Sequence, residues 1–153
     1  MAHQLTDLFN HSEHIPLVVD WIYNAFWADQ QIHTPQSLAK LLSQATSPDA
    51  IPISLLALEG SEPVGTINLV ENDDEQRPHL RPWLAALYVK PEMRGRGVGS
   101  SLVRTLQERA RSMDIDEMYL GTDKPSFYLR LGATVHEQVS DAFCIMHLKS
   151  SAS

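Results

Sequence analysis

Residues 89–102 read Val-Lys-Pro-Glu-Met-Arg-Gly-Arg-Gly-Val-Gly-Ser-Ser-Leu. Before them, residues 83–89 form an apolar run short enough for a buried strand. After them, apolar residues recur at helical spacing, at Val98, Leu102, Val103, Leu106, Ala110 and Met113. The pattern predicts a strand that enters a helix through a turn with three glycines and two arginines.

This turn suits a phosphate group. Glycine permits positive φ and lets a ligand come close to the backbone amides. The first amides of a helix have no internal partner, and the helix dipole makes that end positive. Glycines alone are equally consistent with a plain connecting turn. Arg94 and Arg96, together with the strand-to-helix context, favour a phosphate or pyrophosphate ligand.

Spacing excludes two familiar phosphate motifs. The dinucleotide fingerprint G-x-G-x-x-G does not match glycines at 95, 97 and 99. The P-loop ends in Gly-Lys-Ser/Thr, and no lysine lies near Gly99. Residues 94–99 instead resemble the Arg/Gln-x-x-Gly-x-Gly/Ala signature of the GCN5-related N-acetyltransferase (GNAT) superfamily. In that family, this loop and helix start hold the pyrophosphate of acetyl-coenzyme A.

A second family element lies downstream. Residues 123–133 resemble the family's late Phe-Tyr-x-x-x-Gly-Phe segment, with Tyr128 four residues before Gly132 and Ala133 in place of the usual aromatic. The resemblance implies that Tyr128 is the general acid beside the coenzyme A sulfur. A tyrosine with a pKa of about 10 is protonated at neutral pH and can donate to a thiolate whose pKa is near about 8.5. Taken alone, a tyrosine that packs a short helix would be the simpler interpretation.

The resemblance also implies cofactor contacts along residues 83–89. In the family this strand splays from its neighbour and presents backbone groups to the pantetheine arm, and an amide there would serve as an oxyanion donor. The implied cofactor-binding residues are Leu87, Tyr88, Val89, Arg94, Gly95, Arg96, Gly97, Val98, Gly99 and Ser100.

The general base and the acceptor site are less defined. Many family members carry a glutamate on this strand, but residues 83–89 contain no carboxylate. The preceding polar loop offers Glu71, our first candidate for the base, followed by Asp73, Asp74, Glu75 and His79, although a solvated turn would have the same composition. Aromatic faces suit cations, so Trp21, Trp27 and Trp83 are candidates to line the acceptor site, with core packing as the alternative.

Other chemistry has little support. Cys144 lies in an apolar run and is interpreted as an inert core residue, which favours direct attack by the amine over an acetyl-cysteine route. The seven histidines are scattered, and only His11 and His14 share a helical spacing. Two ligands do not make a zinc site, so no metal is predicted.

Length and charge limit the remaining possibilities. The 153 residues fit a single acetyltransferase domain over 1–149, with a frayed tail at 150–153. A net charge of −7 argues against nucleic acid and mildly favours a cationic small molecule or a basic peptide. No apolar stretch is long enough to span a membrane, and the single cysteine fits a cytoplasmic protein.

Periodicity and turn residues give the expected elements. A helix capped by Asn10 or Ser12 runs to about Trp27, and a helix capped by Thr34 runs to about Ala45. Strands are expected over 51–58, 64–70, 83–89, 117–122, 133–139 and 142–149, helices over 98–112 and 125–131, and a weak strand within 1–10. The expected fold is α/β (mixed α+β) and GNAT-like, with a mostly antiparallel mixed sheet of about six to seven strands flanked by about four helices.

We therefore expect an acetyl-coenzyme A-dependent N-acetyltransferase. The acceptor, a small-molecule amine or a peptide or protein amine, attacks the thioester directly, and Tyr128 protonates the departing thiolate. Because the strand carboxylate is missing, a non-catalytic acyl-coenzyme A-binding sensor or partner-binding module on the same fold is the alternative. An unrelated nucleotide-binding protein is a third option. Members of the family often pair, which makes a homodimer one option for the oligomeric state.

Overall fold

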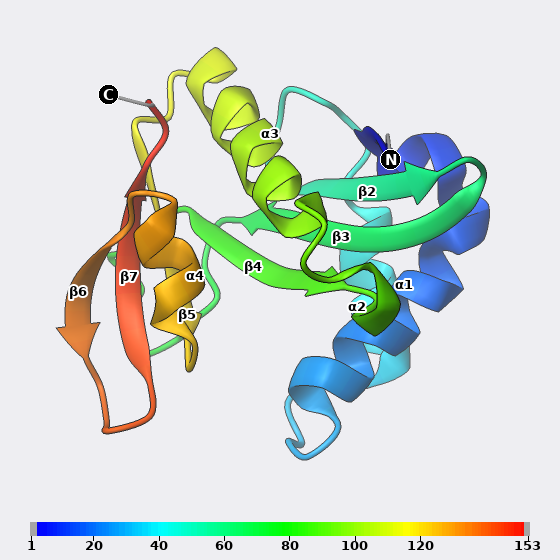
Figure 1. Ribbon diagram of the computed structural model, residues 1–153. Coiled ribbons are helices and arrows are strands. Elements are labelled where there is room, and N and C mark those ends of the chain that lie inside the picture. The colour runs from blue at the N-terminus through cyan, green and yellow to red at the C-terminus, as the bar shows by residue number, and fades with distance from the viewer. Residues whose placement is uncertain (1–2, 152–153) are drawn as a thin grey trace.

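The computed structural model describes residues 3–151. Its centre is a seven-stranded sheet with the order β1-β2-β3-β4-β5-β7-β6 (Figure 1). Neighbouring strands are antiparallel except for the parallel pair β4 and β5, which confirms the expected mixed sheet. The strands are β1 (Gln4–Asp7), β2 (Ile53–Glu59), β3 (Glu62–Val70), β4 (Trp83–Val89), β5 (Glu117–Thr122), β6 (Thr134–Gln138) and β7 (Cys144–Lys149).

Helices cover both faces of the sheet. Seen in Figure 1, α3 and α4 lie in front of the sheet, and α1 and α2 lie behind it. The α-helices are α1 (Ile15–Ile22), α2 (Pro35–Ser43), α3 (Val98–Ser112) and α4 (Pro125–Arg130). Three short helical segments accompany them: the 3-10 segments η1 (Leu8–His14) and η3 (Pro91–Met93), and the π-helical turn η2 (Tyr23–Trp27).

Two apolar clusters hold these layers together. Successive residues of a strand point to opposite faces of the sheet, so β2 contributes side chains to both clusters. Leu55 packs in the cluster under α3, which includes Leu102 and Leu106, whereas Leu56 packs with α1 and α2. Cys144 is buried in the first cluster, as expected for a core residue.

The first helix differs from the prediction. Neither Asn10 nor Ser12 caps it, because residues 8–14 are 3-10 and α1 begins only at Ile15. Pro16 explains the late start, since it has no N–H and cannot make the first bond of a helix capped by Ser12. The α-helix also ends early, at Ile22, and Phe26, which lies within the expected helix, is exposed.

The second helix begins as predicted. The Thr34 hydroxyl accepts a hydrogen bond from the Ser37 amide at 3.0 Å, and the Ser37 hydroxyl accepts one from the Thr34 amide at 2.9 Å. Pro35 takes the first helical position, where its missing N–H costs nothing. This reciprocal pair is a capping box and fixes the direction in which the chain enters α2.

The expectation of a frayed tail is wrong for Ser150. The residue is 1% exposed, its amide donates to the Asp116 carbonyl at 2.9 Å, and its carbonyl accepts from the Arg111 guanidinium. These bonds extend the ordered chain one residue past β7. Within residues 3–151, no helix has the length and apolar character needed to cross a membrane.

Candidate active site

The site begins with an irregularity in β4. Where β4 pairs with β3, Ala86 and Leu87 together face the single residue Ile67, which is a β-bulge. Ala86 has a φ of 52°, a left-handed conformation that is uncommon for a residue other than glycine. The bulge bends the strand just before its last two residues.

Beyond the bulge, β4 separates from β5, its neighbour on the other side. β4 and β5 pair at one register position, Trp83 with Tyr119, and then diverge toward the end of β4 (Figure 1). In the described part of the chain, no strand pairs with the β5-facing side of Leu87, Tyr88 or Val89. The predicted splay is therefore present, and it opens a gap in the middle of the sheet.

The glycine turn follows the open end of β4 and leads into α3. Gly95 and Gly97 have φ values of 77° and 84°, as the glycine spacing predicted. Gly97 is the N-cap of α3 and has no side chain with which to cap the helix. The amides of Val98, Gly99 and Ser100 therefore remain available at the positive end of a 15-residue helix.

The start of α3 touches α4 directly. A Cβ placed on Gly99 would lie 3.3 Å from Cζ of Phe127 and 3.8 Å from Cγ2 of Val89. The Phe127 ring meets the Tyr128 ring edge to face, with centroids 5.0 Å apart. The fold thus brings the end of β4, the glycine turn and Tyr128 together, although they are up to 41 residues apart in the sequence.

Burial raises the pKa of Tyr128 to about 12. The phenol is therefore protonated throughout the physiological pH range and can donate a hydrogen bond or its proton. This protonation state is the one that a general acid requires.

The two arginines of the turn are exposed, but they differ in their contacts. Nε of Arg94 donates to the Val89 carbonyl at 2.8 Å, and its guanidinium lies 5.4 Å from the centre of the Tyr88 ring. Arg96 makes no hydrogen bond or ion pair within residues 3–151. Both add positive charge beside the free amides of α3.

The acetyltransferase (GNAT) family model matches residues 19–133. The chain belongs to this family. Its fold is that of GNAT structures: an acetyltransferase of GNAT family from Staphylococcus aureus Mu50 aligns with a TM-score of 0.73, at 17% identity over 98% of this chain and 100% of that one. No curated protein matches the chain in sequence.

Two further structures of similar fold contain coenzyme A. An aminoglycoside 6'-N-acetyltransferase complexed with coenzyme A has a TM-score of 0.72, at 18% identity over 99% of this chain and 98% of that one. A PaiA N-acetyltransferase from Thermoplasma acidophilum in complex with coenzyme A has a TM-score of 0.73, at 20% identity over 97% of this chain and 99% of that one. Membership in the family agrees with acetyl-coenzyme A, the cosubstrate predicted from the glycine turn.

The predicted base lies away from this part of the GNAT fold. Glu71 is exposed, with a carboxylate oxygen 4.0 Å from the Arg81 guanidinium. Its loop joins β3 to Trp83, the end of β4 that pairs with β5. Leu87 lies four residues further along β4, which places it about 13 Å from Trp83. The structure therefore does not bring Glu71 together with Tyr128 and the glycine turn.

The neighbouring carboxylates of this loop have different surroundings. Asp74 accepts a hydrogen bond from Arg77 at 2.8 Å, and Arg77 also binds Glu137 of β6. Burial, with a contribution from the Asp74 charge, raises the pKa of Asp73 to about 6, although the residue as a whole is exposed. Asp73 is thus a loop carboxylate whose pKa lies close to neutrality.

One of the three tryptophans is excluded from an acceptor site. Trp83 is 1% exposed, and its indole N–H donates to the Leu80 carbonyl at 2.7 Å, so it is a core residue. Its position at the paired end of β4 explains this burial. Trp21 and Trp27 are partly exposed, and each contacts another ring, Tyr88 and His33 respectively.

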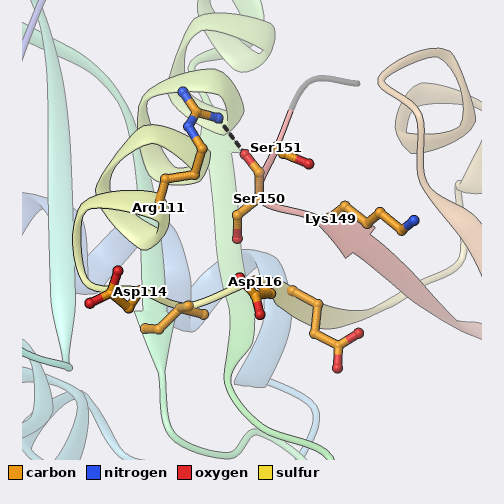
Figure 2. Close-up of a pocket in the computed structure, with 8 residues that line it drawn as sticks. Arg111, Asp114, Asp116, Lys149, Ser150 and Ser151 are labelled. Atoms are coloured by element: carbon orange, nitrogen blue, oxygen red, sulfur yellow. Dashed lines mark hydrogen bonds between the residues drawn. The ribbon is translucent and has the colours of Figure 1, made fainter.

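A cavity of about 460 Å³ lies at the opposite end of α3 (Figure 2). α3 has 15 residues and is about 22 Å long, so this cavity is remote from the glycine turn. It contains none of the predicted site residues and is not where acetyl-coenzyme A is expected. Its lining residues are Arg111, Asp114, Ile115, Asp116, Glu117, Lys149, Ser150 and Ser151.

The role of Gly65 was not predicted from the sequence. A Cβ at this position of β3 would lie 3.1 Å from the Tyr88 carbonyl oxygen, 3.2 Å from Leu102 and 3.3 Å from Val98. Glycine is therefore what allows the start of α3 to pack closely on the sheet beside the gap. An isolated glycine inside a strand pattern signals such a close approach, and that signal was present in the sequence.

Proposed function

We propose that the protein is an acetyl-coenzyme A-dependent N-acetyltransferase in which an amine attacks the thioester directly. The observation that carries this proposal is the meeting of three features at one place: the splayed end of β4, the glycine turn and Tyr128 of α4. Family membership supports acetyl transfer, and the amine acceptor and the residue roles are our proposal.

Each feature has one task. The amides of Val98, Gly99 and Ser100 bind the pyrophosphate, with Arg94 and Arg96 supplying charge. The residues implied to run beside the pantetheine arm are those at the open end of β4, 87–89. One of their amides donates to the thioester oxygen as it gains negative charge.

The reaction needs two proton transfers, one to the departing thiolate and one from the attacking amine. The amine nitrogen forms a bond to the carbonyl carbon, and the tetrahedral intermediate collapses by breaking the carbon–sulfur bond. Tyr128 gives its proton to the departing thiolate, and the amine loses a proton to become the amide. Because the pKa of Tyr128 is about 12, the phenolate regains a proton readily after each turnover.

The base that takes the amine proton acts through water. Glu71 and Asp73 both lie in the β3–β4 loop, at the paired end of β4, so neither contacts the thioester position directly. A carboxylate with a pKa of about 6, such as Asp73, is charged at pH 7 and accepts a proton more readily than an ordinary aspartate. We place Asp73 beside Glu71 as a candidate for this role.

The acceptor is an amine of a small molecule, a peptide or a protein. The net charge of −7 favours a cationic acceptor. Several proteins of similar fold are aminoglycoside 6'-N-acetyltransferases, which gives one chemical class to test first.

A thiol-release screen tests the proposal. Acetyl-coenzyme A is mixed with the protein and with polyamines, aminoglycosides, amino acids and peptides, and free coenzyme A thiol is measured. We expect at least one amine to raise thiol release well above hydrolysis and to be recovered in acetylated form. Binding of acetyl-coenzyme A without transfer to any amine would contradict the proposal. That result would support the acyl-coenzyme A sensor, which the absence of a carboxylate on β4 favours.

A further inference from the structure

Three side chains from three elements form a continuous stack beside the glycine turn. The Trp21 ring of α1 stacks on the Tyr88 ring of β4 with centroids 5.4 Å apart and planes 30° apart. The Arg94 guanidinium carbon lies 5.4 Å from the centre of the same Tyr88 ring. Tyr88 is thus in contact with α1 and with the loop that leads to α3.

The direction of Tyr88 follows from strand geometry. Leu87 and Val89 pack against the core cluster under α3, so Tyr88 between them points to the other face, where α1 lies. Its side chain is therefore not part of the α3 core. This placement leaves the ring free to support Arg94 after the chain turns at η3.

Arg94 is held in a way that leaves its binding groups available. Its Nε donates to the Val89 carbonyl at 2.8 Å, and the Tyr88 ring supports the guanidinium. The two terminal nitrogens make no hydrogen bond or ion pair within residues 3–151. A free arginine side chain loses rotamer entropy when a ligand immobilises it, and the stack reduces this loss before any ligand arrives.

We infer that Tyr88, supported by Trp21, is a positioning residue that holds Arg94 ready for the pyrophosphate of coenzyme A. This inference rests on the proposed function, because it assumes that the glycine turn binds that group. Tyr88 acts through its aromatic face and not through its hydroxyl. It therefore differs from Tyr128, which acts through its hydroxyl.

Calorimetric titration with coenzyme A tests the inference without requiring an acceptor. Because cation–π contacts at exposed sites are modest, Tyr88→Leu should weaken binding about threefold to tenfold. Tyr88→Phe keeps the ring and should bind within about twofold of the wild type, since the aromatic face is retained. Phe26→Leu changes an exposed ring of η2 outside the stack and should bind like the wild type.

A double-mutant cycle separates positioning from general structural damage. If Tyr88 acts through Arg94, Tyr88→Leu should change affinity less than about twofold in an Arg94→Ala background. An equal loss in both backgrounds, or no loss in the wild-type background, would overturn the inference. If thermal melting shows that Tyr88→Leu does not fold, Trp21→Leu replaces it in the same cycle and must show the same dependence on Arg94.

A wild-type protein that does not bind coenzyme A would refute the proposed function and this inference with it. Wild-type binding with an additive cycle would refute the inference alone.

Discussion

Replacement of Gly65 by alanine tests whether the packing of α3 on β3 shapes the site. The added Cβ would lie 3.1 Å from the Tyr88 carbonyl oxygen, which belongs to the sheet and cannot move far. It would also meet Leu102 and Val98 at 3.2 and 3.3 Å. Relief of these contacts requires the first turn of α3 to move away from the sheet, and the glycine turn moves with it.

The expected loss of stability follows from two opposing terms. Overpacking of a well-packed core costs about 1–3 kcal/mol. Alanine also reduces the entropy of the unfolded chain, which restores about 0.4–1 kcal/mol. The net loss is about 1–2 kcal/mol, which lowers Tm by about 2–8 °C for a chain of this size.

Gly60→Ala, in the turn of the same β2–β3 hairpin, is the matched control. Gly60 has a φ of 64°, and a Cβ added there would meet nothing within 4 Å, so alanine costs about 1 kcal/mol through backbone conformation alone. Urea unfolding should show a comparable loss for both variants, whereas coenzyme A titration should show several-fold weaker binding for Gly65→Ala only. Unchanged stability and affinity in Gly65→Ala would refute the packing argument.

Four further predictions concern single side chains. Tyr128→Phe removes the donor and should lower kcat by about a hundredfold while coenzyme A affinity stays near the wild-type value. Asp73 has its pKa raised from 3.8 to about 6, so the folded protein binds a proton that the unfolded chain has released, and stability falls as the pH rises through this window. Asp73→Asn should therefore stabilise the protein at pH 7, by about 1 kcal/mol after allowance for solvent screening, and change little below pH 3.8. Asp7→Ala leaves the Arg109 guanidinium without its two-point partner and should cost about 3 kcal/mol of unfolding free energy. Ser150→Ala removes a buried hydroxyl that has no hydrogen-bond partner within residues 3–151 and should leave stability unchanged or raise it by up to about 1 kcal/mol.

Each of these predictions has a contradicting result. Full kcat in Tyr128→Phe would remove the phenol from the mechanism. An equal effect of Asp73→Asn at both pH values would exclude a raised pKa as its cause. As a control, Glu62→Ala breaks an exposed ion pair with Lys90 and should cost less than about 1 kcal/mol of unfolding free energy. An equal loss of stability in Asp7→Ala would show that the burial of Asp7 does not strengthen its ion pair with Arg109. A loss above about 1 kcal/mol in Ser150→Ala would mean that the hydroxyl has a partner.

Local signals predicted the elements that carry the site. The bounds of β4, α3 and β5 agree with the expected ranges 83–89, 98–112 and 117–122. Pro82 and Pro91 frame the apolar run of β4, Gly97 precedes α3, and apolar residues recur at helical spacing within α3. The same holds for the Thr34 cap, because a capping box is formed by residues close together in the sequence.

Features that depend on distant partners were not predictable in this way. The bulge at Ala86 arises from the pairing of β4 with β3, and the burial of Ser150 arises from Arg111 and the Asp116 segment. The stack of Trp21, Tyr88 and Arg94 joins residues that are up to 73 positions apart. Such contacts are set by tertiary packing, which a single sequence pattern does not encode.

The most direct test of the central claim is calorimetric titration of acetyl-coenzyme A into the wild-type protein and into the Arg94→Ala/Gly97→Val double variant. Gly97 has a φ of 84°, which a β-branched residue rarely adopts, and Arg94 supplies charge beside it. We predict saturable binding at one site per chain in the wild type and none in the double variant, which must first be shown to remain folded. Equal binding by the two proteins, or no binding by the wild type, would contradict the claim.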